Sequence, residues 1–155
     1  MRILNPLIGI SLLFILSFKV DAISYEVIGP CFKTPLYNGI LDINILNNSA
    51  GSASIVIFDL KKIPYVGSEA GFNSITNTPT GKDSIEILSA TKMRAYGWCY
   101  SVNGLSPDVL ANNYTFETTN DKLVWYFAYS TYDNGRWVDY CMPSYNIAAS
   151  QFCSK

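Results

Sequence analysis

Large and small side chains alternate along residues 94–102, and this pattern constrains the fold more than any other feature of the sequence. The large set is Arg94, Tyr96, Trp98, Tyr100 and Val102, and the small set between them is Ala95, Gly97, Cys99 and Ser101. Successive side chains of a β-strand point to opposite faces. The pattern therefore predicts a strand with an aromatic row on one face and a flat surface on the other, against which we expect a helix to pack.

Other segments carry weaker strand signals. Residues 25–28 and 40–45 alternate apolar with polar positions, which is typical of half-buried strands, and the Gly and Pro residues between them favour a strand pair. Further strands are predicted at residues 84–89, 114–116, 123–129 and 137–141, with turns at 103–104, 120–121 and 133–135. The C-terminal half is therefore predicted to form an antiparallel meander.

One helix is predicted over residues 54–63. Its β-branched start, residues 55–58, leaves a buried strand as the alternative, but we favour the helix. The supporting positions are Val56, Leu60 and Ile63 at i, i+4 and i+7, with a cap at Ser52 or Ser54 and a stop at Pro64. Residues 65–81 show neither a helical nor a strand periodicity, and we expect a long ordered loop or lid there.

The N-terminus has the pattern of a secretory signal peptide at residues 1–22. Arg2 precedes an apolar run over residues 8–18, and the small residues Val20 and Ala22 suit signal peptidase. The run is too short to span a bilayer core of roughly 30 Å as a helix, so we expect no membrane anchor after cleavage. Residues 23–155 would then form one secreted or periplasmic domain.

Four cysteines lie in this predicted mature domain. An even number of cysteines in an oxidising compartment favours disulfide bonds. Three pairings are possible, and we favour Cys99 with Cys141 and Cys31 with Cys153. A zinc site is the alternative, but it would need all four thiolates from scattered positions, so we expect no metal.

The chain contains no histidine, which removes the usual general base, the Ser-His-Asp and Cys-His arrangements and most transition-metal sites. We therefore expect a protein that is not an enzyme and takes no cofactor. The chain has 12 acidic and 11 basic side chains, of which residues 1–22 contain one acidic and two basic ones. The predicted mature domain therefore has 11 acidic and 9 basic side chains and a net charge near −2. Nucleic-acid binding needs clustered Lys and Arg, so no nucleic-acid partner is expected.

Three segments together resemble the transcobalamin-like C-terminal domain family. They are residues 96–104, which contain Gly-Trp-x-Tyr-x-Val-Asn-Gly, then Tyr114, and the turn and aromatic strand at residues 120–126. The chain has Asn120-Asp121 where the family often has Gly-Asp, and the resemblance covers about residues 25–140. It implies an α+β fold, in which a β-grasp-like mixed sheet packs on one helix, and it makes a cobalamin-type ligand one candidate.

Six residues form the candidate ligand site. Glu69 and Arg94 could form a bidentate ion pair that fastens the 65–81 segment to the sheet, and we favour this structural interpretation. In the functional alternative, Arg94 lies at the edge of an aromatic pocket for a small organic or glycan ligand. The residues proposed for that pocket are Tyr65, Glu69, Arg94, Tyr96, Trp98 and Tyr100.

Three functions are consistent with these features. The first is a monomeric binding module for a small molecule, and the second is a structural or protein-interaction domain outside the cytoplasm. The third is a hydrolase that uses paired carboxylates. Its candidate pairs are Glu69 with Asp83 or Glu86, and Asp133 with Asp139. The sequence favours them in that order.

Overall fold

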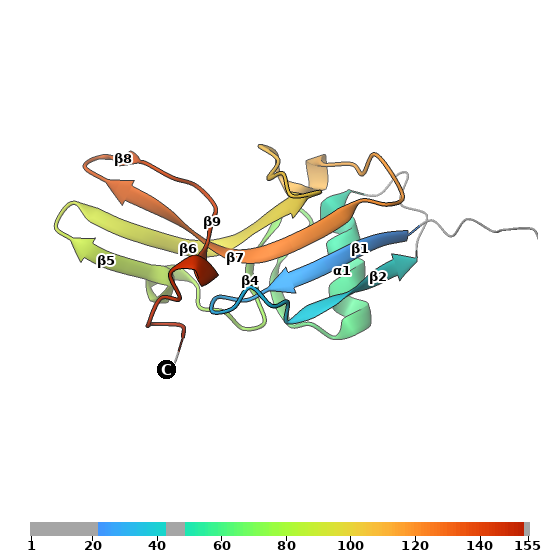
Figure 1. The fold of residues 1–155 in the computed structure, drawn as a ribbon, viewed down its shortest axis with the longest axis horizontal. Helices are drawn as coiled ribbons and strands as arrows, with labels where there is room; N and C mark the ends of the chain where they lie inside the picture. Colours follow the sequence, from blue (N-terminus) through green and yellow to red (C-terminus); the bar gives the residue numbers. More distant parts are fainter. Residues whose placement is uncertain (1–21, 43–48, 154–155) are drawn as a thin grey trace, which may run out of the picture.

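The fold, seen here in a computed structural model, is a curled mixed sheet with one α-helix on one face (Figure 1). The structure describes residues 22–42 and 49–153, so most of the predicted signal peptide lies outside the described residues. The strand order is β2-β1-β7-β6-β5, and β1 runs parallel to β7 whereas the other pairs are antiparallel. The α+β class with a mixed sheet is confirmed, and the β-grasp-like detail stays a prediction.

The sheet contains five longer strands and two short ones. The longer strands are β1 (Ala22–Ile28), β2 (Tyr37–Asp42), β5 (Ile85–Ser89), β6 (Lys92–Val102) and β7 (Lys122–Asp133). The short strands β8 (Arg136–Trp137) and β9 (Met142–Pro143) pair with β7 beyond the end of β1. The predicted strand pair at the start is confirmed, although residues 43–45 of its second strand lie outside the described residues.

Strands β6 and β7 form the long central ribbon of the molecule. They pair without a register shift from Lys92↔Asp133 to Val102↔Leu123, so the predicted extended segment is confirmed. Because opposite residues share a face, Trp98 lies beside Phe127 and Cys99 beside Tyr126. The two faces of β6 therefore continue across β7.

The helix α1 (Ala50–Lys61) begins earlier than predicted. Ser49 is its N-cap, and the Ser49 hydroxyl oxygen accepts the Ser52 N–H at 3.0 Å. The buried side is also different from the predicted one, because Val56 and Leu60 are 38% and 65% exposed. The residues that α1 buries are Ala50, Gly51, Ala53, Ser54, Ile57 and Phe58.

The helix packs on the aromatic face of the ribbon, so the prediction that it covers the flat face was wrong. The reason is that the small side chains come from the helix: Ala50 and Ala53 leave room for Tyr100, Val102 and Trp125. The buried hydroxyl of Ser54 also accepts the indole N–H of Trp125 at 2.7 Å. That hydrogen bond satisfies the one polar atom of the tryptophan.

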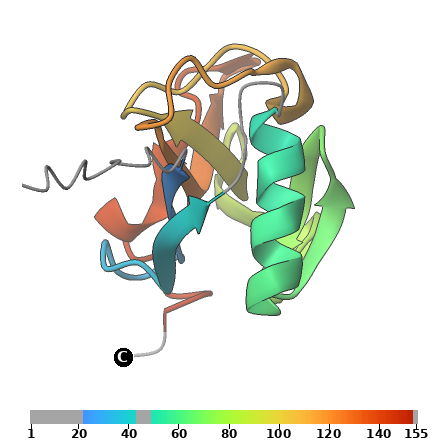
Figure 2. The same cartoon turned by 90° about the vertical axis from the view of Figure 1, so that its right-hand side faces the viewer.

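A second small sheet lies beside the helix, where a loop was predicted (Figure 2). It consists of β3 (Tyr65–Ser68) and β4 (Gly71–Ile75), an antiparallel hairpin whose Phe72 and Ile75 are buried in the main core. The predicted strand at 114–116 forms only an isolated bridge, Ser49↔Thr115. Short 3₁₀-helices complete the fold: η1 (Gly81–Ser84), η2 (Ala111–Asn113) and η3 (Ser144–Asn146).

The C-terminal segment wraps around the edge of β7. Cys141 and Tyr145 pack on the flat face beside Tyr126, whereas Ala149 and Phe152 pack with Tyr96 and Phe127 on the aromatic face. Two disulfide bonds hold this segment, Cys99–Cys141 and Cys31–Cys153, and the predicted pairing is confirmed. No helix among the described residues is long and apolar enough to cross a membrane.

Candidate functional site

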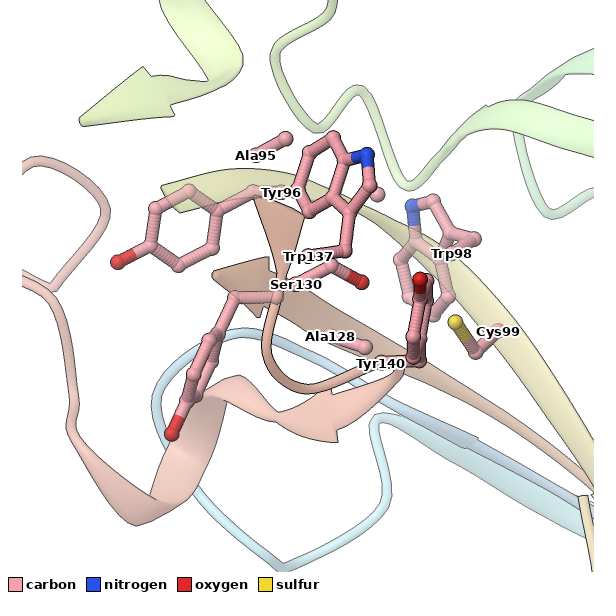
Figure 3. Close-up of a pocket in the computed structure, with 10 residues that line it drawn as sticks. Ala95, Tyr96, Trp98, Cys99, Ala128, Ser130, Trp137 and Tyr140 are labelled. Carbon is pink, nitrogen blue, oxygen red and sulfur yellow. The ribbon is translucent and has the colours of Figure 1, made fainter. Parts of the chain in front are cut away.

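The flat face of the ribbon forms the floor of an open aromatic pocket of about 340 Å³ (Figure 3). Its floor consists of small residues from two paired strands, Ala95, Gly97 and Cys99 from β6 and Ala128 and Ser130 from β7. Strand alternation directs the side chains of the neighbouring residues to the other face. The floor is therefore flat because both strands carry small residues at matching positions.

Two aromatic side chains form the walls. Trp137 follows the turn at Asn134 and Gly135, both of which have positive φ, and its ring lies 6.4 Å from that of Tyr140 with an interplanar angle of 39°. A second aromatic contact, with Tyr132 at 5.4 Å, holds the Trp137 ring in place. Trp137 is 39% exposed and Tyr140 is 68% exposed, so both keep surface that a ligand could cover.

The lining of this pocket is uncharged. Tyr96, Trp98 and Tyr129 also border it, although their side chains point to the other face of the ribbon, and none of its ten residues is acidic or basic. The polar groups available at the pocket are the Ser130 hydroxyl, the Trp137 indole N–H and the Tyr140 hydroxyl. The Ser130 oxygen accepts the Cys141 N–H at 3.2 Å, which leaves its own hydrogen available to donate. Such a site suits a neutral ligand with a flat or ring-shaped apolar face.

The predicted ion pair between Glu69 and Arg94 is not formed. Arg94 instead donates to Glu86 Oε2 at 3.1 Å, because these two residues are register partners on β5 and β6. Glu69 is exposed in the turn between β3 and β4, where its carbonyl group lies against Gly51 of α1. The 65–81 segment is thus held by this backbone contact and by the burial of Phe72 and Ile75, and not by an ion pair of Glu69.

Tyr96 completes a polar cluster with Arg94 and Glu86. Its hydroxyl donates to Glu86 Oε2 at 2.6 Å, and the Arg94 guanidinium lies 5.1 Å from the centre of the Tyr129 ring. Burial, followed by the hydrogen bond to the Glu86 carboxylate, raises the pKa of Tyr96 far above its ordinary value. Tyr96 therefore stays neutral and serves as a donor that fixes β5 to β6.

The structure distributes the remaining predicted site residues over different places. Tyr65 packs against Phe58 and donates to Asp59 Oδ1 at 3.1 Å. Tyr100 lies in the core and donates to the Val109 carbonyl oxygen at 2.8 Å. Of the six residues, only Tyr96 and Trp98 line the aromatic pocket, and the Trp98 indole N–H is held by Thr78 at 2.7 Å.

The candidate carboxylates lie away from the aromatic pocket. Asp133 pairs with Lys92 at 3.1 Å, and Asp139 accepts the Thr131 N–H at 2.6 Å. Glu86 is engaged by Arg94 and Tyr96. None of the carboxylates proposed for hydrolysis lines the pocket.

The sequence analysis did not predict the pocket walls, Trp137 and Tyr140, although the sequence contains a signal for them. Ala128 and Ser130 repeat on β7 the small-residue alternation of β6, which predicts a flat patch two strands wide. Trp137 and Tyr140 follow directly after a turn that returns the chain to this patch. Two aromatic residues next to such a surface are typical of a ligand site.

Comparison with known proteins finds a family model that matches part of the chain. Residues 82–128 match the model of a family described as a domain of unknown function (DUF4430), a stretch that holds β5, β6 and part of β7. No curated protein matches the chain. A solved structure from Ruminococcus gnavus, described as a "putative metal binding protein", is 10% identical, covers 67% of this chain and 94% of its own, and superposes with a TM-score of 0.38.

The metal binding in that description is not carried over to this chain. Within residues 22–42 and 49–153, no group of three or more His, Cys, Asp or Glu side chains comes together in a way that could hold a metal ion. All four cysteines are in disulfide bonds. Four of the five floor residues, Ala95, Gly97, Cys99 and Ala128, fall within the matched segment, whereas Ser130, Trp137 and Tyr140 lie beyond it.

Proposed function

We propose that the chain is an exported, monomeric and non-catalytic module that binds a small neutral organic or glycan ligand in the aromatic pocket. The observation that supports this most directly is the open flat face, bordered by the exposed rings of Trp137 and Tyr140. A flat apolar floor with aromatic walls gains binding energy from stacking and from burial of apolar area. The two disulfide bonds fit a small domain that works outside the cytoplasm.

The lining narrows the class of ligand. Because no charged side chain lines the pocket, an anionic or cationic ligand would lose its hydration without gaining a partner. A sugar ring or a planar heterocycle can place its apolar face on the floor and direct polar groups to Ser130 and Tyr140. A cobalamin-type ligand belongs among the probes because of the resemblance to the transcobalamin-like family, in which case the pocket would contact one face of the ligand.

A thermal-shift screen of the oxidised chain tests the proposal. The probes are neutral mono- and oligosaccharides, planar heterocycles and cobalamins, each at millimolar concentration or at its solubility limit. We expect one class to raise the melting temperature and to quench tryptophan fluorescence, because a ligand that binds only the folded state stabilises it.

Two variants localise the effect. Trp137→Ala should weaken binding at least tenfold, whereas Phe32→Ala, an aromatic residue that is 75% exposed in the β1–β2 loop, should leave affinity unchanged. A stabilising ligand that binds the Trp137→Ala variant with full affinity would place the site elsewhere. If no class shifts the melting temperature, the second function, a structural or protein-interaction domain, takes precedence.

A further inference from the structure

The aromatic pocket borders a second hollow of about 690 Å³ at strand β6. Three residues of this strand, Tyr96, Gly97 and Trp98, line both spaces. Strand β5 pairs with β6 only as far as Ala95, so it does not separate the two spaces along this edge. The pocket and the hollow therefore share a border, and one ligand can contact both.

Gly97 keeps this border open. Apart from its chain neighbours, a Cβ atom at this position would meet no heavy atom of the described residues within 4 Å. Gly97 is also absent from the glycines with positive φ, so its backbone does not require glycine. The property that matters at this position is therefore the small size of the residue and not its conformational freedom.

The second hollow is neutral and rich in hydroxyl groups. No acidic or basic residue lines it. The Ser74 hydroxyl donates to the Thr78 carbonyl oxygen at 2.7 Å, and the Ser84 hydroxyl donates to the Gly81 carbonyl oxygen at 2.8 Å. A hydroxyl oxygen that donates its hydrogen can still accept one. The polar side chains of the lining are Asn73, Ser74, Thr78, Thr80, Ser84 and Tyr96. Such a lining suits a ligand that carries many neutral donors.

Trp98 is held in a fixed orientation between the two spaces. Its indole N–H donates to the Thr78 hydroxyl at 2.7 Å, and its ring lies 5.6 Å from that of Phe127. The one polar atom of the tryptophan is thus engaged by the protein. Because Trp98 is only partly buried, the surface that its ring offers to a ligand is apolar and suits stacking.

The turn that carries Thr78 has an unusual backbone. Thr76 and Asn77 have φ values of 57° and 59°, and a positive φ is rare for a β-branched residue such as threonine. Strained backbone of this kind gathers at binding sites, where the surrounding structure maintains it. Here it precedes the threonine that orients Trp98, which is an independent reason to assign a binding role to this border.

We propose that the ligand is a linear neutral oligosaccharide, with one sugar ring on the flat floor and a neighbouring ring in the second hollow. This inference rests on the function proposed above and narrows its class of ligand. A sugar ring has an apolar face for the floor and for Trp98, and its hydroxyl groups can donate to the neutral oxygen atoms of the hollow. A planar heterocycle would cover the floor but would leave those oxygen atoms unused.

The dependence of affinity on oligosaccharide length tests this inference. The intact oxidised chain is titrated by NMR and calorimetry with glucose, xylose and N-acetylglucosamine oligosaccharides of one to four units. We expect the affinity for one series to rise at least tenfold between one and three units, because a single unit occupies only one of the two spaces.

Two substitutions by tryptophan localise the gain with length. Thr80→Trp narrows the second hollow from an exposed position and should remove the gain, while the affinity for the single unit stays unchanged. Thr34→Trp is the matched control, because Thr34 is an exposed threonine in the loop between β1 and β2, and this variant should keep the full gain. Gly97→Leu, which fills the shared border, should weaken every length at least tenfold.

The outcomes separate this inference from the proposed function. Equal affinity for one and three units, lost in Trp137→Ala, would overturn the inference and leave the aromatic pocket as the ligand site. A gain with length that persists in Thr80→Trp would overturn it as well. Binding of no oligosaccharide would also overturn it, whereas the proposed function would then be decided by the planar heterocycles of the thermal-shift screen.

Discussion

At the scale of single residues, Asp121 anchors the segment between β6 and β7. It is 3% exposed, and its Oδ2 atom accepts the N–H groups of Glu117 and Thr118 at 2.9 and 3.1 Å. Its Oδ1 atom accepts Asn103 Nδ2 at 2.9 Å, which ties the turn after β6 to the start of β7. The sequence predicted turns at both places, but it did not show that one carboxylate joins them.

The pH dependence of stability should reflect this carboxylate. Burial raises the pKa of Asp121, but the hydrogen bonds from Asn103, Thr118 and Glu117 outweigh it and lower the pKa below its ordinary value. Because this pKa is lower in the folded than in the unfolded state, the ionised Asp121 contributes fully to the free energy of unfolding above about pH 5. That contribution is lost as the pH falls through the acidic range. Urea unfolding between pH 2 and pH 7 should show a shallower acid loss for Asp121→Asn than for the wild type, and equal slopes would contradict this role.

At the scale of elements, Gly51 sets how closely the β3–β4 hairpin approaches α1. A Cβ atom at this position would lie 2.7 Å from the Glu69 carbonyl carbon and 2.9 Å from its Cα, and still closer to its oxygen. Both neighbours are backbone atoms, so neither can rotate away. The turn of the β3–β4 hairpin therefore packs directly against Gly51.

The Gly51→Ala variant brings two effects into opposition. Alanine is more favourable than glycine inside a helix by about 1 kcal/mol, whereas forcing the hairpin away from α1 disrupts packing by about 1–3 kcal/mol. We therefore expect net destabilisation in chemical unfolding. Val56→Ala on the exposed side of α1 is the control and should change stability by less than about 1 kcal/mol. A Gly51→Ala protein more stable than the wild type would show that the hairpin can shift freely.

The helix also shows why element types were easier to predict than faces. Its existence followed from a cap, a periodic pattern and Pro64. Half of the buried residues, Ala50, Gly51 and Ala53, carry little hydrophobic signal, so the pattern did not show which side is buried. The stronger apolar residue Leu60 lies outside. The strands β3 and β4 were missed for a related reason: their sequence is rich in Gly and Ser, and only the burial of Phe72 and Ile75 holds them extended.

At the scale of the whole molecule, we expect the two disulfide bonds to differ in role: both stabilise the fold, but only one also shapes the pocket. The Cys31–Cys153 bond closes a separation of 122 residues and the Cys99–Cys141 bond one of 42 residues. Loop-closure entropy then predicts that the first stabilises by about 5 kcal/mol and the second by about 4 kcal/mol. Only the second has a cysteine in the pocket floor.

Paired serine variants separate these roles. Replacing Cys31 and Cys153 by Ser should lower the free energy of unfolding by several kcal/mol and leave ligand affinity nearly unchanged in the folded fraction. Replacing Cys99 and Cys141 by Ser should also lower the affinity for the ligand, because the segment that carries Tyr140 loses its attachment to the floor. Chemical unfolding and titration with the best ligand measure the two quantities. Equal affinity in both double variants would mean that the bond does not shape the pocket.

The candidate site could be predicted only in part, because its floor follows from a local sequence pattern whereas its walls depend on long-range packing. The floor follows from local alternation along residues 94–102, which the sequence shows directly. The walls depend on where Trp137 and Tyr140 return to the ribbon, and that placement is decided by the wrapping of the C-terminal segment around β7. Long-range packing of this kind leaves no periodic signal.

The wrapping of the C-terminal segment also affects how the chain matures. In each disulfide bond the later cysteine, Cys141 or Cys153, belongs to that segment, while Cys31 and Cys99 leave the ribosome well before it. During synthesis these two early thiols are therefore present together without their proper partners, and a bond between them would be non-native. Correct oxidation thus has to wait for the C-terminal segment, and if a Cys31–Cys99 bond forms first, thiol exchange has to replace it by the native bonds.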